Sequence, residues 1–201
     1  ARGISRLGIP AYNWWNECQH GVGRAGVATI FPQPIGLAAM FDAPFLQEIA
    51  SVISDEVRAK YNQAVNQNAK WEKLVRLLPD SAAGWLLARK YQYRGLTCWS
   101  PNINIFRDPR WGRGHETFGE DPFLTSRLGI AFVRGLQGEH PDYIKVVATP
   151  KHFAVHSGPE KAGMLSTRLL ARKTFMKPTY LPSRPVFRKA RLHPLCLPTM
   201  C

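Results

Sequence analysis

The sequence predicts an α/β protein built around a parallel β-sheet. Short apolar segments alternate along the chain with longer segments of helical periodicity. Residues 144–149, IKVVAT, form an apolar, β-branched run of the kind that a buried parallel strand needs. Each predicted strand is followed by a cluster of polar side chains. Strand, loop and helix recurring at this spacing are typical of an α/β domain with a parallel sheet.

The composition suits a globular core. The chain has 201 residues, of which 45% are hydrophobic and 11% aromatic. This length is enough for one substantial domain or for part of a larger one. No window has the uninterrupted apolar length of a membrane span. The first ten residues, ARGISRLGIP, lack an initiator Met and the charged-then-apolar order of a signal peptide. We therefore expect a fragment at that end, and the compartment is not predicted.

The positive charge is concentrated at one end. The net charge is +13, but residues 1–161 hold 19 Lys/Arg against 14 Asp/Glu, whereas residues 162–201 hold eight Lys/Arg and no acid. Such a distribution argues against a nucleic-acid or membrane surface for the chain as a whole. A basic tail that binds a polyanion remains the alternative for residues 162–201.

The first predicted strand and helix lie in the N-terminal third. Residues 7–15 are expected to form a strand that runs into a loop. A helix is expected over residues 42–61, with Asp42 as its N-cap and Pro44 in its first turn. The apolar residues expected on its buried face are Phe45, Ile49, Val52, Ile53 and Val57.

A second helix follows an extended segment and a charged loop. Residues 96–106 are extended in character, and residues 107–121 form the loop. Asp121 and Pro122 are expected to open the helix. The residues on its apolar side are Leu124, Leu128, Phe132 and Leu136.

Residues 62–94 stand apart from this alternation. They carry helical periodicity that is interrupted at Pro79 and Asp80. We expect one or two amphipathic helices inserted in a connection and packed on their own domain. A partner-binding or membrane-surface role is the alternative.

The four cysteines indicate no metal site. Cys18, Cys98, Cys196 and Cys201 show neither a C-x-x-C spacing nor a dense disulfide pattern. Cys18 and Cys98 are expected to be small, buried or half-buried residues.

The first polar cluster follows the first predicted strand. Trp14 and Trp15 precede Glu17, and His20 comes shortly after. Aromatic faces beside a carboxylate suit a sugar, whose C–H face lies on the ring while the carboxylate accepts hydroxyl hydrogen bonds. The alternative is that the tryptophans are core and Glu17 is a surface acid, and the cluster taken alone favours this alternative.

Two further polar clusters follow later strands. In the loop 107–121, three arginines interleave with acids, so opposite charges can pair within it. A nucleic-acid surface would leave such arginines unpaired, whereas a loop of this kind is often built around a site. Lys151 and His152 end the run 144–149, and their donors suit hydroxyl recognition. The alternatives are a salt-bridged structural loop and a fortuitous pair at a strand end. In a parallel barrel all strand ends open on one face, so we expect the three clusters to converge.

Three segments strongly resemble glycoside hydrolase family 3, in its β-xylosidase and β-glucosidase branch. They are residues 12–42, 95–124 and 151–160, within a match over about 6–161 that excludes 62–94. The resemblance implies part of a (β/α)8 barrel of the TIM type. It also implies cleavage of terminal β-linked glucose or xylose with retention. The implied partners are β-glucoside or β-xyloside oligosaccharides, with no nucleic acid, membrane, metal or organic cofactor. Oligomeric state is left open.

Family site residues carry over at four positions. Glu17 occupies the place of the acid that holds sugar hydroxyls, Arg113 that of the sugar-binding arginine, and Lys151 and His152 that of the Lys-His pair. The family's Arg-His pair after GPE is missing, and no S-D-W motif occurs. The resemblance therefore implies that the nucleophile, the acid/base and roughly half the barrel are absent. Residues 1–161 would be the N-terminal portion of the barrel domain.

The genetic code suggests an origin for the basic tail. The shifted reading combines the third base of each codon, starting from Lys161, with the first two bases of the next codon. The amino acids that it permits include strings that resemble the family, among them the missing Arg-His pair. We predict that residues 162–201 are a frame-shifted, largely disordered translation, attached to an incomplete barrel that is poorly soluble or unfolds without cooperativity. By lineage the chain is then a β-glycosidase that is itself inactive. The alternatives are a non-catalytic sugar-binding fragment and a pseudogene-like product.

Overall fold

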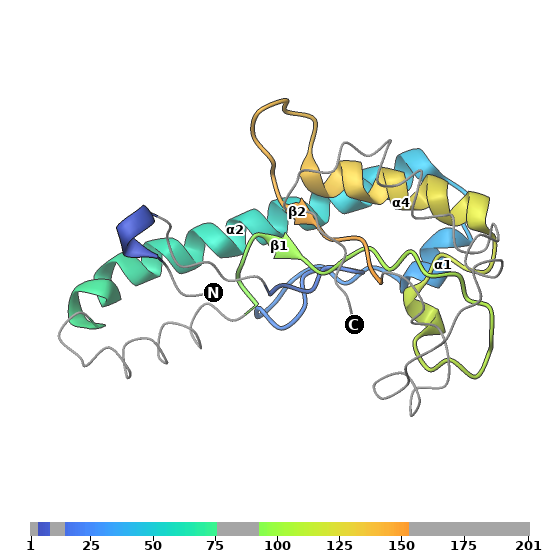
Figure 1. The fold of residues 1–201 in the computed structure, drawn as a ribbon, viewed down its shortest axis with the longest axis horizontal. Helices are drawn as coiled ribbons and strands as arrows, with labels where there is room; N and C mark the ends of the chain where they lie inside the picture. The colour runs from blue at the N-terminus through green and yellow to red at the C-terminus, as the bar shows by residue number, and fades with distance from the viewer. Residues whose placement is uncertain (1–3, 9–14, 76–92, 153–201) are drawn as a thin grey trace.

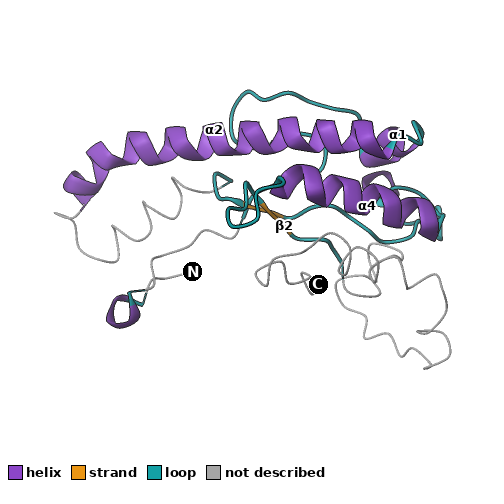
Figure 2. Ribbon diagram, turned by 90° about the horizontal axis from the view of Figure 1, so that it is seen from above, coloured by secondary structure: helices purple, strands orange, loops and turns teal. Residues whose placement is uncertain are grey.

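The computed structural model describes residues 4–8, 15–75 and 93–152. A small parallel sheet lies beside two long helices, α2 and α4, which run side by side (Figures 1 and 2). Three short helices complete the described elements: η1 (Ser5–Leu7), α1 (Pro34–Ala38) and η2 (Gly114–Glu116). Within these residues, no helix is both long and apolar enough to cross a membrane.

The sheet is parallel, as predicted. β1 (Thr97–Cys98) pairs with β2 (Val147–Ala148), so Cys98 lies opposite Ala148. Single parallel bridges extend the pairing, one from Asn16 to Cys98 and one from Asn102 to Lys151. The segment around Asn16, β1 and β2 therefore lie side by side in chain order. The paired strands are shorter than the runs 96–106 and 144–149, and most of the strand expected over 7–15 lies outside the described residues.

Helix α2 (Ala43–Val75) begins where the sequence predicts and continues further. The Asp42 carboxylate accepts the backbone N–H of Phe45 at 2.9 Å, which confirms the cap. No break occurs at residue 62, so the start expected for the inserted segment lies inside one continuous helix. The remainder of that segment, at residues 76–92, lies outside the described residues.

The buried face of α2 differs from the prediction at two positions. Phe45 is 47% exposed and Val52 is 46% exposed. At roughly 100° per residue, both lie to one side of the stripe that is buried where α2 packs on α4. The residues that form this buried stripe are Leu46, Ile49, Ala50, Ile53, Val57 and Ala64.

Helix α4 (Pro122–Gln137) agrees with the sequence prediction. The Asp121 carboxylate accepts the N–H of Leu124 at 2.6 Å, and Pro122 occupies the first turn. The three residues Leu128, Phe132 and Leu136 are buried, and Leu124 is partly buried.

Helices α2 and α4 cross closely at Gly135. A Cβ atom built on Gly135 would lie 2.3 Å from the Gln47 carbonyl oxygen and 2.6 Å from the Ala50 Cβ. Because a side chain at this position would collide with α2, glycine lets the two backbones approach and buries the apolar stripe between them.

Cys18 and Cys98 are both fully buried, as expected, but they are joined by a disulfide that the sequence analysis did not predict. Their Cα atoms are 5.7 Å apart, within the usual range. The two residues are 80 positions apart in sequence. Their spacing therefore carried no local signal, and only the parallel pairing of their segments brings them together.

Candidate functional site

The structure brings the four predicted site residues together. Glu17 follows the segment that bridges to β1, and Lys151 lies just beyond β2. The Lys151 Nζ atom is 3.8 Å from the Glu17 Oε1 atom, and the lysine side chain is only 5% exposed. A buried ammonium needs a charged or polar partner, and Glu17 supplies one.

The backbone around Lys151 is fixed by the sheet. Its N–H donates to the Pro101 carbonyl at 2.9 Å, and its carbonyl accepts the N–H of Ile103 at 2.8 Å. The bridge to Asn102 follows from these bonds. These bonds fix the backbone position of Lys151 at the end of the sheet. The peptide bond that joins Lys151 to His152 is cis.

Arg113 is held in a two-point ion pair with Glu116. Its Nε and Nη2 atoms donate to the two carboxylate oxygens at 2.8 and 2.6 Å. Both groups are partly buried, with 27% and 18% of their side chains exposed. This pairing fixes the plane of the guanidinium, and its Nη1 atom lies 3.4 Å from the Nε2 atom of His152.

His152 is oriented by Asn104. The Asn104 Oδ1 atom accepts the backbone N–H of His152 at 3.0 Å and lies 2.7 Å from its Nδ1 atom. Because this oxygen is an acceptor, the assignment consistent with it puts the proton on Nδ1. Nε2 then carries the lone pair that faces Arg113.

The two carboxylates of the site have opposite pKa shifts. Burial raises the pKa of Glu17, an effect that the nearby charge of Lys151 offsets only in part. Burial also acts to raise the pKa of Glu116, but the hydrogen bonds and charge of Arg113, with Lys151, outweigh it and hold the pKa below its ordinary value. Glu116 is therefore the more strongly ionised of the two.

Sequence reasoning missed Asn104 and assigned Glu116 only in general terms. Asn104 lies two residues past Asn102 on the segment that continues β1, and its side chain crosses to His152. The signal available was its position at a strand end. Glu116 was expected to pair with one of three arginines, and it pairs with Arg113.

One further pair forms within the charged loop, as predicted for this loop. Arg110 forms an ion pair with Asp108 at 2.6 Å. Hydrogen bonds from Arg110 hold the pKa of Asp108 at about 2. Asp121 caps α4 instead of pairing with an arginine.

The aromatic residues of the first cluster are only partly described. Trp15 stacks on Trp99 with ring centroids 5.5 Å apart and meets Tyr93 edge-on at 5.3 Å. Trp14 lies outside the described residues. The Nδ1 atom of His20 lies 3.1 Å from the Phe31 carbonyl oxygen. His20 therefore contacts the backbone of the loop that precedes α1, and not the four predicted site residues.

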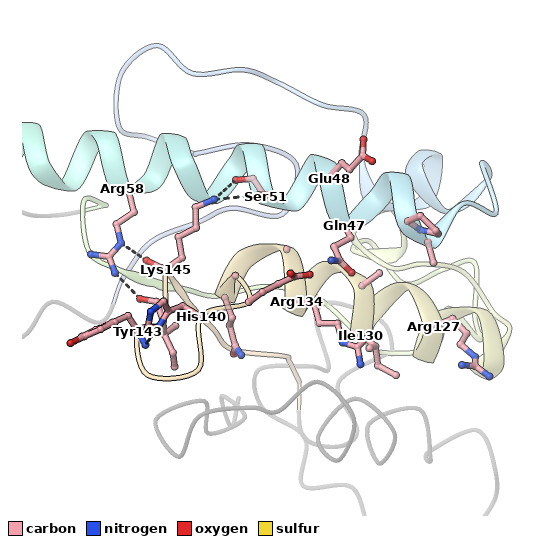
Figure 3. Close-up of a pocket in the computed structure, with 18 residues that line it drawn as sticks. Gln47, Glu48, Ser51, Arg58, Arg127, Ile130, Arg134, His140, Tyr143 and Lys145 are labelled. Atoms are coloured by element: carbon pink, nitrogen blue, oxygen red, sulfur yellow. Dashed lines mark hydrogen bonds between the residues drawn. The ribbon is translucent and has the colours of Figure 1, made fainter.

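A groove of about 1020 Å³ lies elsewhere, between α2, α4 and the segment that follows α4 (Figure 3). None of the four predicted site residues lines it. Arg58 donates from α2 to the carbonyls of Ile144 and Lys145, and Lys145 pairs with Asp55 at 2.7 Å. These contacts tie the segment after α4 to α2, so we assign the groove a structural role. Among the described ranges, no group of three or more His, Cys, Asp or Glu side chains could hold a metal ion.

The fold and the site together define a class of protein. Parallel strands flanked by helices, with charged and amide side chains gathered where the strands end, are the layout of a barrel-type enzyme domain. The family description "glycosyl hydrolase family 3 N terminal domain" matches residues 62–168. This range includes the whole of the segment 62–94, so the exclusion of that segment from the family match was wrong. The chain belongs to glycoside hydrolase family 3.

Similar proteins carry xylosidase and glucosidase names. The chain is 45% identical over 158 residues to a xylan 1,4-β-xylosidase from Xylanibacter ruminicola, a match of 78% of this chain and 16% of that protein. It is 44% identical over 169 residues to β-D-xylosidase 3 of Arabidopsis thaliana, covering 78% and 18%. The chain thus spans less than a fifth of these curated relatives.

Solved structures of the same family superpose on the chain. The exo-β-xylosidase XlnD, in complex with a xylobiose aziridine activity-based probe, gives a TM-score of 0.70 at 32% identity, covering 94% of this chain and 23% of that one. A β-glucosidase from Listeria innocua, in complex with glucose, gives 0.64 at 27% identity, covering 98% and 22%. These neighbours support the α/β barrel-type fold that the sequence predicts.

Proposed function

We propose that Glu17, Arg113, Lys151 and His152 bind the hydroxyls of a terminal β-linked xylose or glucose. The observation that carries this proposal is the pairing of a buried Lys151 with Glu17, 3.8 Å apart, where the two parallel segments that flank β1 end. A pyranose hydroxyl is both a donor and an acceptor. It can therefore receive a hydrogen bond from the ammonium while donating one to the carboxylate.

Arg113 and His152 extend the same recognition surface. Each is oriented by its own partner, Glu116 for the arginine and Asn104 for the imidazole. Side chains that are held before the ligand arrives lose little conformational entropy on binding, which favours affinity for a small polar ligand. The names and bound sugars of the relatives support a β-glycoside as that ligand.

We propose that the longer polypeptide of this type is a retaining β-glycosidase, but that the 201-residue chain does not hydrolyse glycosides. Retention needs two carboxyl groups about 5 Å apart, one to attack and one to protonate the leaving oxygen. The S-D-W motif implied for the nucleophile does not occur in the chain. Glu17 is engaged with Lys151 and Glu116 with Arg113, so neither is placed for attack.

Binding and hydrolysis are tested separately. Saturation-transfer NMR with methyl β-xyloside and methyl β-glucoside should detect weak binding to the chain, and Lys151→Ala should abolish it. Arg58→Ala, in the groove between α2 and α4, is the control and should leave binding unchanged. Binding that survives Lys151→Ala would show that the site is misplaced.

The hydrolysis assay uses aryl β-xyloside and β-glucoside, from which nitrophenol is released on cleavage. We expect no release above that of the Glu17→Ala variant. Turnover by the chain that Glu17→Ala abolishes would show that the catalytic carboxylates have been misassigned.

We also propose that residues 162–201 derive from a shifted reading frame, with residues 1–161 as the barrel portion. The forty tail residues hold eight Lys/Arg and no acid, a composition at odds with the rest of the chain. Sequencing the coding DNA beyond Lys161 tests this: restoring the frame should yield an Arg-His pair and then an S-D-W motif. A restored frame with neither would contradict the proposal.

A further inference from the structure

Cys98 anchors both segments that carry the ion pair of the site. Its sulfur is bonded to Cys18, the residue directly after Glu17. Its carbonyl oxygen accepts the backbone N–H and the hydroxyl of Thr149, at 3.0 and 2.7 Å, two residues before Lys151. One buried residue of β1 therefore fixes the acid on one side and the lysine on the other.

Two hydrogen bonds also hold the segment before Glu17 beside β1. The N–H of Trp99 donates to the Asn16 carbonyl at 3.0 Å, and the Asn16 side chain donates to the Gly95 carbonyl at 2.9 Å. Both bonds are made by Asn16, the residue that precedes Glu17 in the sequence. Beyond it, the disulfide at Cys18 is the covalent tie to the sheet.

Glu17 has a physical reason to leave this position. Burial raises the pKa of its carboxyl, so the ionised form is less stable here than in water, and Lys151 compensates only in part. The side chain is still 34% exposed, so a small outward movement of the segment would hydrate the carboxylate and widen the 3.8 Å gap to Lys151. The disulfide at Cys18, one residue after Glu17, is placed to oppose that movement.

We propose that the Cys18–Cys98 disulfide is a positioning element of the sugar site, which holds the Glu17 carboxylate against Lys151. The sugar ligand rests on the proposed function, whereas the positioning of Glu17 does not. Reduction by an external dithiol breaks the S–S bond: each cysteine sulfur takes up one electron and one proton, and the dithiol becomes a cyclic disulfide. The Glu17 segment then loses its covalent tie to β1. Because such disulfides persist in oxidising compartments, the chain would acquire its binding-competent site there.

The test compares the oxidised and reduced full-length chain. Cys196→Ser and Cys201→Ser are introduced as a background, so that only the buried pair responds. Under denaturing conditions a thiol reagent should then find no free thiol before treatment with dithiothreitol and two afterwards. Free thiols in the untreated chain would overturn the proposal.

Two readouts follow on the same samples. NMR titration of the Glu17 carboxyl carbon should give a raised pKa in the oxidised chain and a value closer to ordinary after reduction. The affinity for methyl β-xyloside should fall roughly tenfold, as expected for a misplaced hydrogen bond to a charged group. Cys18→Ser should reproduce both changes, whereas amide protection of α4 should be unaltered.

The outcomes separate the two proposals. An unchanged Glu17 pKa after complete reduction overturns the positioning role of the disulfide, whether or not the affinity for methyl β-xyloside changes. A pKa that moves on reduction in a chain that never binds the sugar supports the positioning role and contradicts the proposed function. In Glu17→Gln, affinity should already be low and reduction should not lower it further.

Discussion

Replacing Gly135 by alanine is expected to push α2 and α4 apart. The new Cβ would lie 2.3 Å from the Gln47 carbonyl oxygen, 2.6 Å from the Ala50 Cβ and 3.0 Å from the Ser51 nitrogen. Two of the three neighbours are backbone atoms, which cannot rotate away as a side chain can. Relieving the closest contact requires a displacement of about 1 Å between the helices, given the usual separation of non-bonded atoms.

The magnitude follows from two opposing terms. Overpacking at a close contact costs about 1–3 kcal/mol. Alanine stabilises a helix interior by about 1 kcal/mol relative to glycine, because of its higher helix propensity. The difference is a net loss of about 0–2 kcal/mol of local stability. Because two of the close contacts are with backbone atoms, we expect Gly135→Ala to fall in the upper half of this range.

Hydrogen–deuterium exchange of α2 and α4 measures this loss without requiring cooperative unfolding of the whole chain. Amides of both helices should exchange about tenfold faster in Gly135→Ala. The matched control is Gly36→Ala in α1, where the new Cβ would meet only the Pro32 Cβ at 3.5 Å, an ordinary contact. Equal or greater protection in Gly135→Ala than in the control would refute the close crossing of α2 and α4.

Three further predictions concern single carboxyl groups. Asp121→Ala removes the N-cap of α4 and should cost about 1 kcal/mol, seen as faster exchange in its first turn; unchanged exchange there would argue against the cap. In Arg110→Ala, carbon NMR titration should show the pKa of Asp108 rising from about 2 towards its ordinary 3.8, and a value that stays near 2 would contradict the pairing. The raised pKa of Glu17 means that the folded state binds more protons than the unfolded state between pH 4.5 and that raised pKa. Stability should therefore fall as pH rises through this window, and Glu17→Gln should remove this contribution; an identical pH profile in that variant would contradict the assignment.

Local features were predictable because their causes lie within a few residues. Asp42 and Asp121 each precede an apolar periodic run and a proline, so both caps could be inferred without knowing the fold. The apolar, extended character of 96–106 and 144–149 predicted strands of a parallel sheet, but not that these two segments pair with each other. The convergence of Glu17 with Lys151 then followed from the rule that polar groups at parallel strand ends share one face.

Features that depend on packing were not predictable. Phe45 and Val52 belong to the apolar periodicity of α2, but they lie outside the stripe that is buried, which includes Leu46 and Ala50. The partner of Cys18 is set by the strand pairing, which a spacing of 80 residues does not reveal. The contact between Asn104 and His152 similarly depends on how two strands align.

The central claim is that Glu17, Arg113, Lys151 and His152 form a sugar-binding site. The most direct measurement is a crystal structure of the oxidised chain grown with methyl β-xyloside. We expect sugar oxygens within hydrogen-bonding distance of Glu17 and Lys151, with Arg113 and His152 facing the same ring. A sugar bound instead in the groove between α2 and α4, or a crystal in which Lys151 lies far from Glu17, would contradict the claim.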